Sequence, residues 1–179
     1  MRRRTSAYPL LVVEPDPTRR AAVSQFLRAR GFDVTSVADA QESSVWVEQE
    51  EYALAVVGLG EACEGAGQRG GLDALRAIRR ALPQCQIVVI LPSKVDLSSC
   101  CEAVSLGACS FVDGGGGMVP PGLLARLRQA VGRFEAIREE ARQLHDRGIF
   151  DQTGFAGQSR QMAELLLQAS NLSERSIDA

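Results

Sequence analysis

The chain has 179 residues, of which 45% are hydrophobic and 23% are charged, and its formal net charge is −2. This composition is ordinary for a soluble globular protein. The near-neutral charge excludes an overall electrostatic attraction of the chain to nucleic acid or to an anionic membrane. No apolar run approaches the roughly 20 residues needed to cross a bilayer, and the run after Arg2–Arg4 is too short for a secretory signal. We therefore expect a cytoplasmic protein with no membrane partner, built as one compact domain with an extension.

Short apolar runs alternate with helical patterns along most of the chain. Runs bounded by Gly or Pro predict strands, and apolar residues at spacings of three and four predict helices. The run at 53–57 has no polar alternation, which is typical of a strand covered on both faces. In chain order, we expect a strand at 10–13, a helix at 18–30, a strand at 32–37, a helix at 39–51, a strand at 53–57, a helix at 72–81, a strand at 87–91, a helix at 98–106, a strand at 110–112 and a last helix from 123.

This alternation predicts an α/β fold. Five βα units with short connections favour a doubly wound parallel sheet, and the flavodoxin-like, five-stranded sheet of order 2-1-3-4-5 is the small fold that fits. In such a sheet, functional residues follow the carboxyl ends of the strands. The segment Gly60–Gly71 is too rich in glycine to hold regular structure, so it is expected to be a loop.

The five cysteines show no C-x-x-C spacing, and the single histidine leaves a zinc site few candidate ligands. A free cysteine usually behaves as a small buried hydrophobe, which is what we expect of Cys85, Cys101 and Cys109. Cys63 lies in the glycine-rich segment, where no neighbour would activate it. No paired carboxylates, nucleophile with a histidine or phosphate loop follows a strand, so we expect no enzyme activity, no catalytic residue and no metal site in this chain.

Three segments, VVEPDPTRRAAVSQFLRARGFDV, GLDALRAIRRALPQCQIVVIL and AVSLGACSFV, resemble parts of a response-regulator receiver domain. The resemblance covers roughly Pro9 to Val131 and implies the CheY-like fold. A working receiver accepts a phosphoryl group on an aspartate at the end of the third strand, beside a Mg²⁺ ion held by an acidic pair. It also uses a hydroxyl and a lysine to receive and report the phosphoryl charge.

The resemblance places unsuitable residues at these positions. Without a carboxylate at residue 58 no acyl phosphate can form, and Glu61 lies in a flexible segment that cannot hold a nucleophile in line. We therefore expect a degenerate pocket, that is, a pseudoreceiver that does not use aspartyl phosphorylation. The acidic pair falls on Glu14 and Pro15, with Asp16 beside them, and the phosphoacceptor falls on Gly58. The hydroxyl falls on Pro92, with Ser93 beside it. The lysine and the proline after it fall on Gly114 and Gly115.

Apolar residues at alternating spacings of three and four continue past the receiver-like segment. This is the a/d pattern of a coiled coil over about three heptads, and opposite charges at i,i+3 support the helix. We expect this helix to form the seam of a homodimer, with a solvated helical extension as the alternative. The predicted seam consists of Leu123, Leu127, Ala130, Phe134, Ile137, Ala141 and Leu144.

Residues 151–179 resemble the first segment of the AAA+ ATPase module of NtrC-type sigma-54-dependent transcription activators. In that family a Gly-x-Ser segment, here Gly157–Ser159, precedes a helix, here about Arg160–Asn171. The chain contains no G-x-x-x-x-G-K-[ST] loop, so it holds no ATP or Mg²⁺ itself. The resemblance places Phe155, Ala156 and Gly157 near the adenine pocket of a full-length protein, which would also bind sigma-54 RNA polymerase and DNA through domains outside this chain.

The expected organisation is therefore a flexible tail (1–8), a pseudoreceiver (9–122), a receiver helix that continues as a coiled-coil linker (123–148) and the N-terminal part of an AAA+ domain (149–179). The leading interpretation is a phosphorylation-independent regulatory and dimerisation module that controls assembly of the attached AAA+ ATPase. The alternative is a pseudoreceiver that senses a small ligand or a protein partner through the emptied pocket and Gly60–Gly71.

Overall fold

The structure is a computed structural model that describes residues 8–60, 67–94, 96–115 and 117–146. The predictions for residues 1–7, for Cys63 and Glu61, and for Phe155, Ala156 and Gly157 lie outside these residues. The chain divides into two compact units, Met1–Gly132 and Arg133–Ala179. Within the described ranges, no helix is both long enough and apolar enough to span a membrane.

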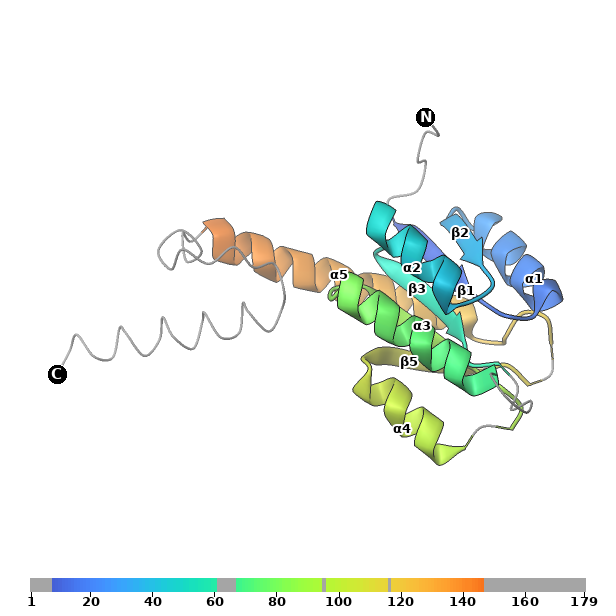
Figure 1. The fold of residues 1–179 in the computed structure, drawn as a ribbon. Coiled ribbons are helices and arrows are strands. Elements are labelled where there is room, and N and C mark those ends of the chain that lie inside the picture. The colour runs from blue at the N-terminus through green and yellow to red at the C-terminus, as the bar shows by residue number, and fades with distance from the viewer. Residues whose placement is uncertain (1–7, 61–66, 95, 116, 147–179) are drawn as a thin grey trace. The chain divides into compact units, whose positions relative to one another are not determined.

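Strands and helices alternate along the described chain, as the apolar runs predict. Figure 1 shows the elements in order, coloured from blue to orange. They are β1 (Pro9–Val13), α1 (Pro17–Arg28), β2 (Asp33–Val37), α2 (Ala40–Gln49), β3 (Leu54–Gly58), α3 (Gly67–Ala81), β4 (Gln86–Leu91), α4 (Leu97–Ser105), β5 (Ala108–Asp113) and α5 (Leu123–Asp146).

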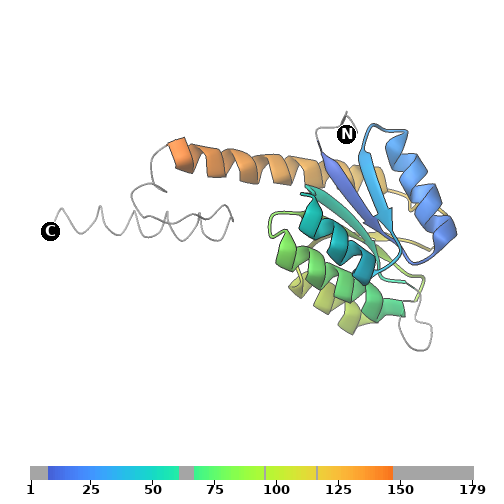
Figure 2. The same ribbon diagram turned by 45° about the horizontal axis from the view of Figure 1, so that its top comes forward.

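The strands form one sheet in the order β2-β1-β3-β4-β5, and every neighbouring pair is parallel. The predicted flavodoxin-like order is confirmed. Helices α2, α3 and α4 cover one face of the sheet, and α1 and the first turns of α5 cover the other (Figures 1 and 2). Because all five strands run in parallel, their carboxyl ends meet at one edge, which is where the receiver-like positions fall.

Side chains alternate between the two faces along each strand. Val13 and Val57 lie in the apolar cluster that includes Leu75 and Ile78 of α3, and the two valines are partners across β1 and β3. The next residue along each strand faces the opposite side of the sheet. Glu14 and Gly58 are therefore neighbours on the face that α1 covers.

The predicted loop Gly60–Gly71 is wrong in its last part, because α3 begins at Gly67 rather than at Leu72. Gly71 serves a close approach between backbones. A Cβ atom placed on Gly71 would lie 2.7 Å from the carbonyl oxygen of Gly58 and 2.7 Å from the Cα atom of Leu59. Glycine at residue 71 thus allows the helix to pack directly on the end of β3.

The predicted dimer seam is divided between the two units. Leu123 and Leu127 are 0% exposed and Ala130 is 1% exposed, so these side chains belong to the core of the first unit and cannot also face a partner. In the second unit, Phe134, Ile137 and Ala141 are half-buried. The side chain of Leu144 lies outside the described residues. The heptad pattern therefore combines a stretch of core in the first unit with a shorter, half-buried stretch in the second.

The cysteines differ in their surroundings. Cys85 is buried, and burial raises the pKa of its thiol to about 12, so it behaves as the predicted small hydrophobe. Cys109 is half-buried. The prediction is wrong for Cys101, which is exposed because it lies on the outer side of α4.

Candidate functional site at the carboxyl edge of the sheet

Glu14 follows β1 directly and is the one charged residue among the largest fully buried side chains of the described chain. Its backbone N–H donates to the carbonyl oxygen of Val37 at 3.1 Å. Its Oε1 accepts a hydrogen bond from the backbone N–H of Asp16 at 3.2 Å. Its Oε2 is buried and has no hydrogen-bond partner among the described residues. The carboxyl group is therefore held inside the protein rather than directed into solvent.

Gly58 lies opposite this carboxyl group, at the end of β3. A Cβ atom placed on Gly58 would lie 2.3 Å from Oε2 of Glu14 and 2.9 Å from its Cδ. Distances below about 3 Å are far inside van der Waals contact. The space that a side chain at residue 58 needs is thus taken by Glu14.

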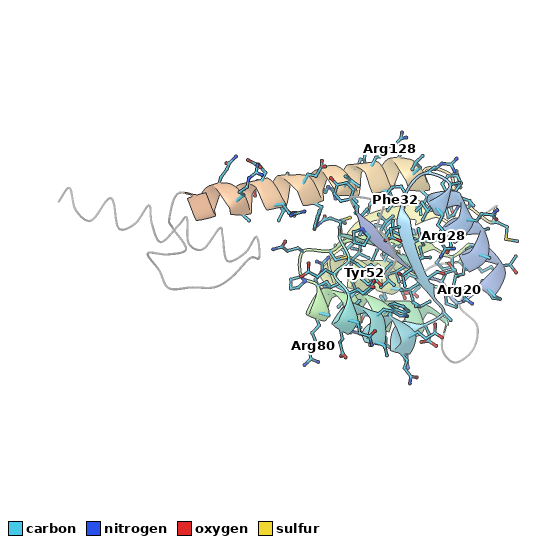
Figure 3. All side chains as sticks on the ribbon, turned by 90° about the horizontal axis from the view of Figure 1, so that it is seen from above. Arg20, Arg28, Phe32, Tyr52, Arg80 and Arg128 are labelled. Carbon is cyan, nitrogen blue, oxygen red and sulfur yellow. The ribbon has the colours of Figure 1, made fainter. Side chains whose placement is uncertain are left out.

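Burial is the main influence on the protonation of Glu14, because it raises the pKa of the carboxyl group above the usual 4.5. The hydrogen bond from Asp16 and the positive charge of Arg19 lower the pKa and offset part of this effect. Arg20, labelled in Figure 3, holds the adjoining backbone, since its Nη1 donates to the carbonyl oxygens of Glu14 (2.8 Å) and Pro15 (3.3 Å).

Gly114 follows β5 and is buried, and its N–H donates to the carbonyl oxygen of Leu91 at 2.9 Å. A Cβ atom placed there would lie 2.5 Å from that oxygen and 2.7 Å from Cγ2 of Ile90. The backbone therefore leaves no room for a lysine side chain. The same point lies 3.4 Å from Nη1 of Arg19, so α1 brings a cation to this part of the site.

The remaining receiver-like positions have structural roles or face solvent. Asp16 is exposed, and its carboxylate caps α1 by accepting the N–H of Arg19 at 2.7 Å. Pro15 and Ser93 are exposed and Pro92 is buried. The structure thus brings Glu14 and Gly58 together, whereas Asp16 is directed to its own helix.

The described side chains at this edge do not fit a Mg²⁺ site. Mg²⁺ requires octahedral oxygen ligands and usually at least one accessible carboxylate. Glu14 provides a carboxyl group, but its Oε2 is directed at the backbone of Gly58. Across the described ranges, no three side chains of His, Cys, Asp or Glu gather where they would hold a metal ion.

A small cavity of about 210 Å³ opens at the same edge. It is smaller than ordinary ligand pockets, which have about 300–1,000 Å³. Asp39 is the one charged residue among those that line it, and its carboxylate caps α2 by accepting the N–H of Glu42 at 2.9 Å. The lining residues are Val13, Pro15, Ala38, Asp39, Gly58, Gly70 and Gly71.

Sequence reasoning did not find Arg19 or Asp39. Arg19 belongs to a helix whose pattern indicates only an exposed face, and its place near Gly114 depends on how α1 packs on the sheet. Asp39 was identified only as the start of a helix. No spacing in the sequence marks either residue as part of the site.

Solved structures of receiver domains have the same fold as this chain. A CheY-like response regulator receiver domain from Methanospirillum hungatei JF-1 matches with a TM-score of 0.62 and 18% identity, over 73% of this chain and 98% of that one. A response regulator from Burkholderia pseudomallei, solved with a phosphorylated aspartic acid, a calcium ion and citrate, matches with a TM-score of 0.57 and 18% identity, over 92% of each chain.

NtrX from Brucella abortus, solved in complex with ADP, matches with a TM-score of 0.62 and 19% identity. The match covers 74% of this chain and 29% of NtrX. Comparison with models of protein families and with curated proteins finds no match. The structural matches establish the CheY-like receiver fold.

Proposed function

We propose that this chain is the regulatory and dimerisation module of a sigma-54-dependent transcription activator, and that it works without phosphorylation. The observation that carries the proposal is Gly58 at the end of β3, with the carboxyl group of Glu14 in the space of the missing side chain. A receiver fold without an acceptor carboxylate retains a regulatory surface but has no group on which an acyl phosphate can form.

Two observations support the link to an activator. Residues 151–179 resemble the start of an NtrC-type AAA+ module, and NtrX, a larger protein solved with ADP, matches this chain over 29% of its length. In this proposal the module controls assembly of the attached ATPase. ATP hydrolysis, DNA binding and contact with RNA polymerase belong to parts outside this chain.

The second unit supports the dimer. α5 continues past the unit boundary after Gly132, and Phe134, Ile137 and Ala141 are half-buried at heptad spacing. Arg138 lies over the ring of Phe134, with 5.7 Å from its Cζ to the ring centroid. An apolar stripe with such flanking charges is typical of a helix that pairs with another helix.

Phosphotransfer from a small donor tests the proposed independence. The full chain is incubated with phosphoramidate and Mg²⁺, and its intact mass is measured. We expect no added phosphoryl group, while a receiver that keeps its acceptor aspartate gains one under the same conditions. A gain in mass that hydroxylamine removes indicates an acyl phosphate and contradicts the proposal.

The cavity beside Gly58 favours a second function, the sensing of a small ligand. A ligand that binds the folded state at 100 times its Kd stabilises it by about 2.7 kcal/mol. A thermal-shift screen of small metabolites should then find one that stabilises the wild type but not Gly70→Leu. Gly70 lines the cavity and has open space around its Cβ position, so a leucine there meets no backbone clash.

A further inference from the structure

We infer that Glu14 is a built-in occupant of the phosphoacceptor site, and that residue 58 is glycine because the Glu14 carboxyl group needs its space. This inference rests on the proposed phosphorylation-independent function and names what keeps the site closed to a phosphoryl group and to Mg²⁺. Residues 14 and 58, on neighbouring strands, then form one coupled feature rather than two separate losses of receiver side chains.

The Glu14 carboxyl group and a side chain at residue 58 compete for the same space. A Cβ atom on Gly58 would lie 2.3 Å from Oε2 of Glu14, so even alanine at residue 58 forces the carboxyl group to move. Glu14 is 1% exposed, so its carboxyl group occupies this space inside the protein rather than at the surface. The present position of the carboxyl group therefore depends on glycine at residue 58.

Hydrogen bonds hold the backbone of Glu14 and one oxygen of its carboxyl group. Its N–H is bonded to Val37, its Oε1 to the N–H of Asp16, and its carbonyl oxygen to the guanidinium of Arg20. These three contacts tie it to β2, to the start of α1 and to the body of that helix. The carboxyl group itself is held by the hydrogen bond from Asp16, while the other two contacts fix the backbone from which the side chain projects.

The polar groups at the site come from β1 and α1. In a working receiver the resemblance implies a carboxylate from the third strand and a cation after the fifth. Here β3 ends in Gly58, the buried carboxyl group is that of Glu14, and Nη1 of Arg19 lies 3.4 Å from the Cβ position of Gly114. Arg19 also acts electrostatically on Glu14, lowering its pKa. The site thus holds a carboxyl group and a nearby cation although residue 58 has no side chain.

A double-mutant cycle tests the coupling. Thermal unfolding of the full chain is measured for the wild type, Gly58→Ala, Glu14→Ala and the double variant. Overpacking at residue 58 should lower Tm by roughly 3–10 °C in the wild-type background. In the Glu14→Ala background the same substitution should lower Tm by less than half as much, since the colliding group is gone.

Two controls distinguish this coupling from a general loss of stability. Gly71→Ala collides with the backbone of Gly58 and Leu59, so its effect should be the same with and without Glu14→Ala. Glu14→Gln keeps the size of the side chain and should keep the full penalty of Gly58→Ala. If Glu14→Ala does not fold, Glu14→Asp, which is one methylene shorter, replaces it in the cycle.

Equal penalties for Gly58→Ala in both backgrounds overturn the inference. That result leaves the proposed function in place, because the mass measurement with phosphoramidate decides phosphorylation independently. Conversely, a phosphorylated wild type contradicts the proposed function whatever the cycle shows.

Discussion

Glu14 carries a buried carboxyl group whose Oε2 lacks a hydrogen-bond partner within the described residues. Because burial raises its pKa above 4.5, the folded state binds this proton more tightly than the unfolded state does. The stability that it contributes is fully present below pH 4.5 and is lost as pH rises through the raised pKa. The pKa of Asp96 is shifted in the opposite direction, because the hydrogen bonds that its carboxylate accepts from Ser99 lower it.

The pH dependence of one variant isolates this effect. Glu14→Gln cannot ionise, so its stability relative to the wild type should increase as pH rises from about 4.5 toward 8. The other carboxylates cancel in the difference between the two proteins. Urea unfolding midpoints of both, measured across this range, provide the check. A difference that stays constant with pH would show that Glu14 has the same pKa in the folded and unfolded states.

At the scale of elements, the N-terminal half of α3 depends on two adjacent glycines with opposite requirements. Gly70 has open space at its Cβ position, so Gly70→Ala should stabilise the protein by about 0.5–1 kcal/mol through helix propensity. Gly71 touches the end of β3, so Gly71→Ala should destabilise it by about 1–3 kcal/mol. Urea unfolding of both variants measures these changes. Effects of the same sign would contradict the close approach of α3 to β3.

Arg79 links α3 to the end of α4. Its guanidinium donates to the carbonyl oxygens of Pro83, Leu106 (3.4 Å) and Gly107 (2.7 Å). Charged hydrogen bonds of this kind are worth roughly 1.5–3 kcal/mol each when well formed.

Arg79→Ala should therefore lower the free energy of unfolding by about 1–3 kcal/mol. Arg80→Ala is the matched control, since Arg80 is exposed and projects away from the domain (Figure 3), and it should change this free energy by less than about 0.5 kcal/mol. Similar losses for both variants would refute the role of Arg79 as a link between the helices.

The sequence predicted the order of elements because each buried strand is a distinct apolar run between helical patterns. The prediction of a loop up to Gly71 failed because glycine has two physical meanings: here α3 begins at Gly67, and Gly71 allows that helix to pack closely on β3. On α2, Val45 and Trp46 are 52% and 39% exposed, whereas Ser43 is buried and its hydroxyl donates to the carbonyl oxygen of Ala40.

Resemblance placed Glu14, Gly58 and Gly114 at one edge of the sheet, and in the structure the carboxyl group of Glu14 lies against Gly58. It did not show that Glu14 fills the space at Gly58, because that contact joins two strands far apart in the chain. The role of Asp16 as a helix cap was also missed, because a carboxylate beside an acidic pair and a carboxylate that caps a helix have the same sequence signature.

At the scale of the whole molecule, α5 joins a receiver fold to a second unit and carries the proposed dimer contact. Phe134→Glu with Ile137→Glu should convert a dimer into a monomer, because charges in a helical seam are desolvated without partners. Unfolding of the first unit should be unchanged. The matched control, Gly132→Glu with Ala136→Glu, places the same charges on exposed positions of the helix and should leave the dimer intact. Loss of the dimer in both double variants would mean that added charge alone disrupts it.

The molar mass of the full chain, measured by light scattering with and without phosphoramidate and Mg²⁺, tests the central claim most directly. The account predicts the mass of a dimer in both conditions, because the seam assembles without a phosphoryl group on residue 58. A monomer that becomes a dimer only with the phosphoryl donor would contradict phosphorylation independence, and a monomer in both conditions would contradict the dimerisation module.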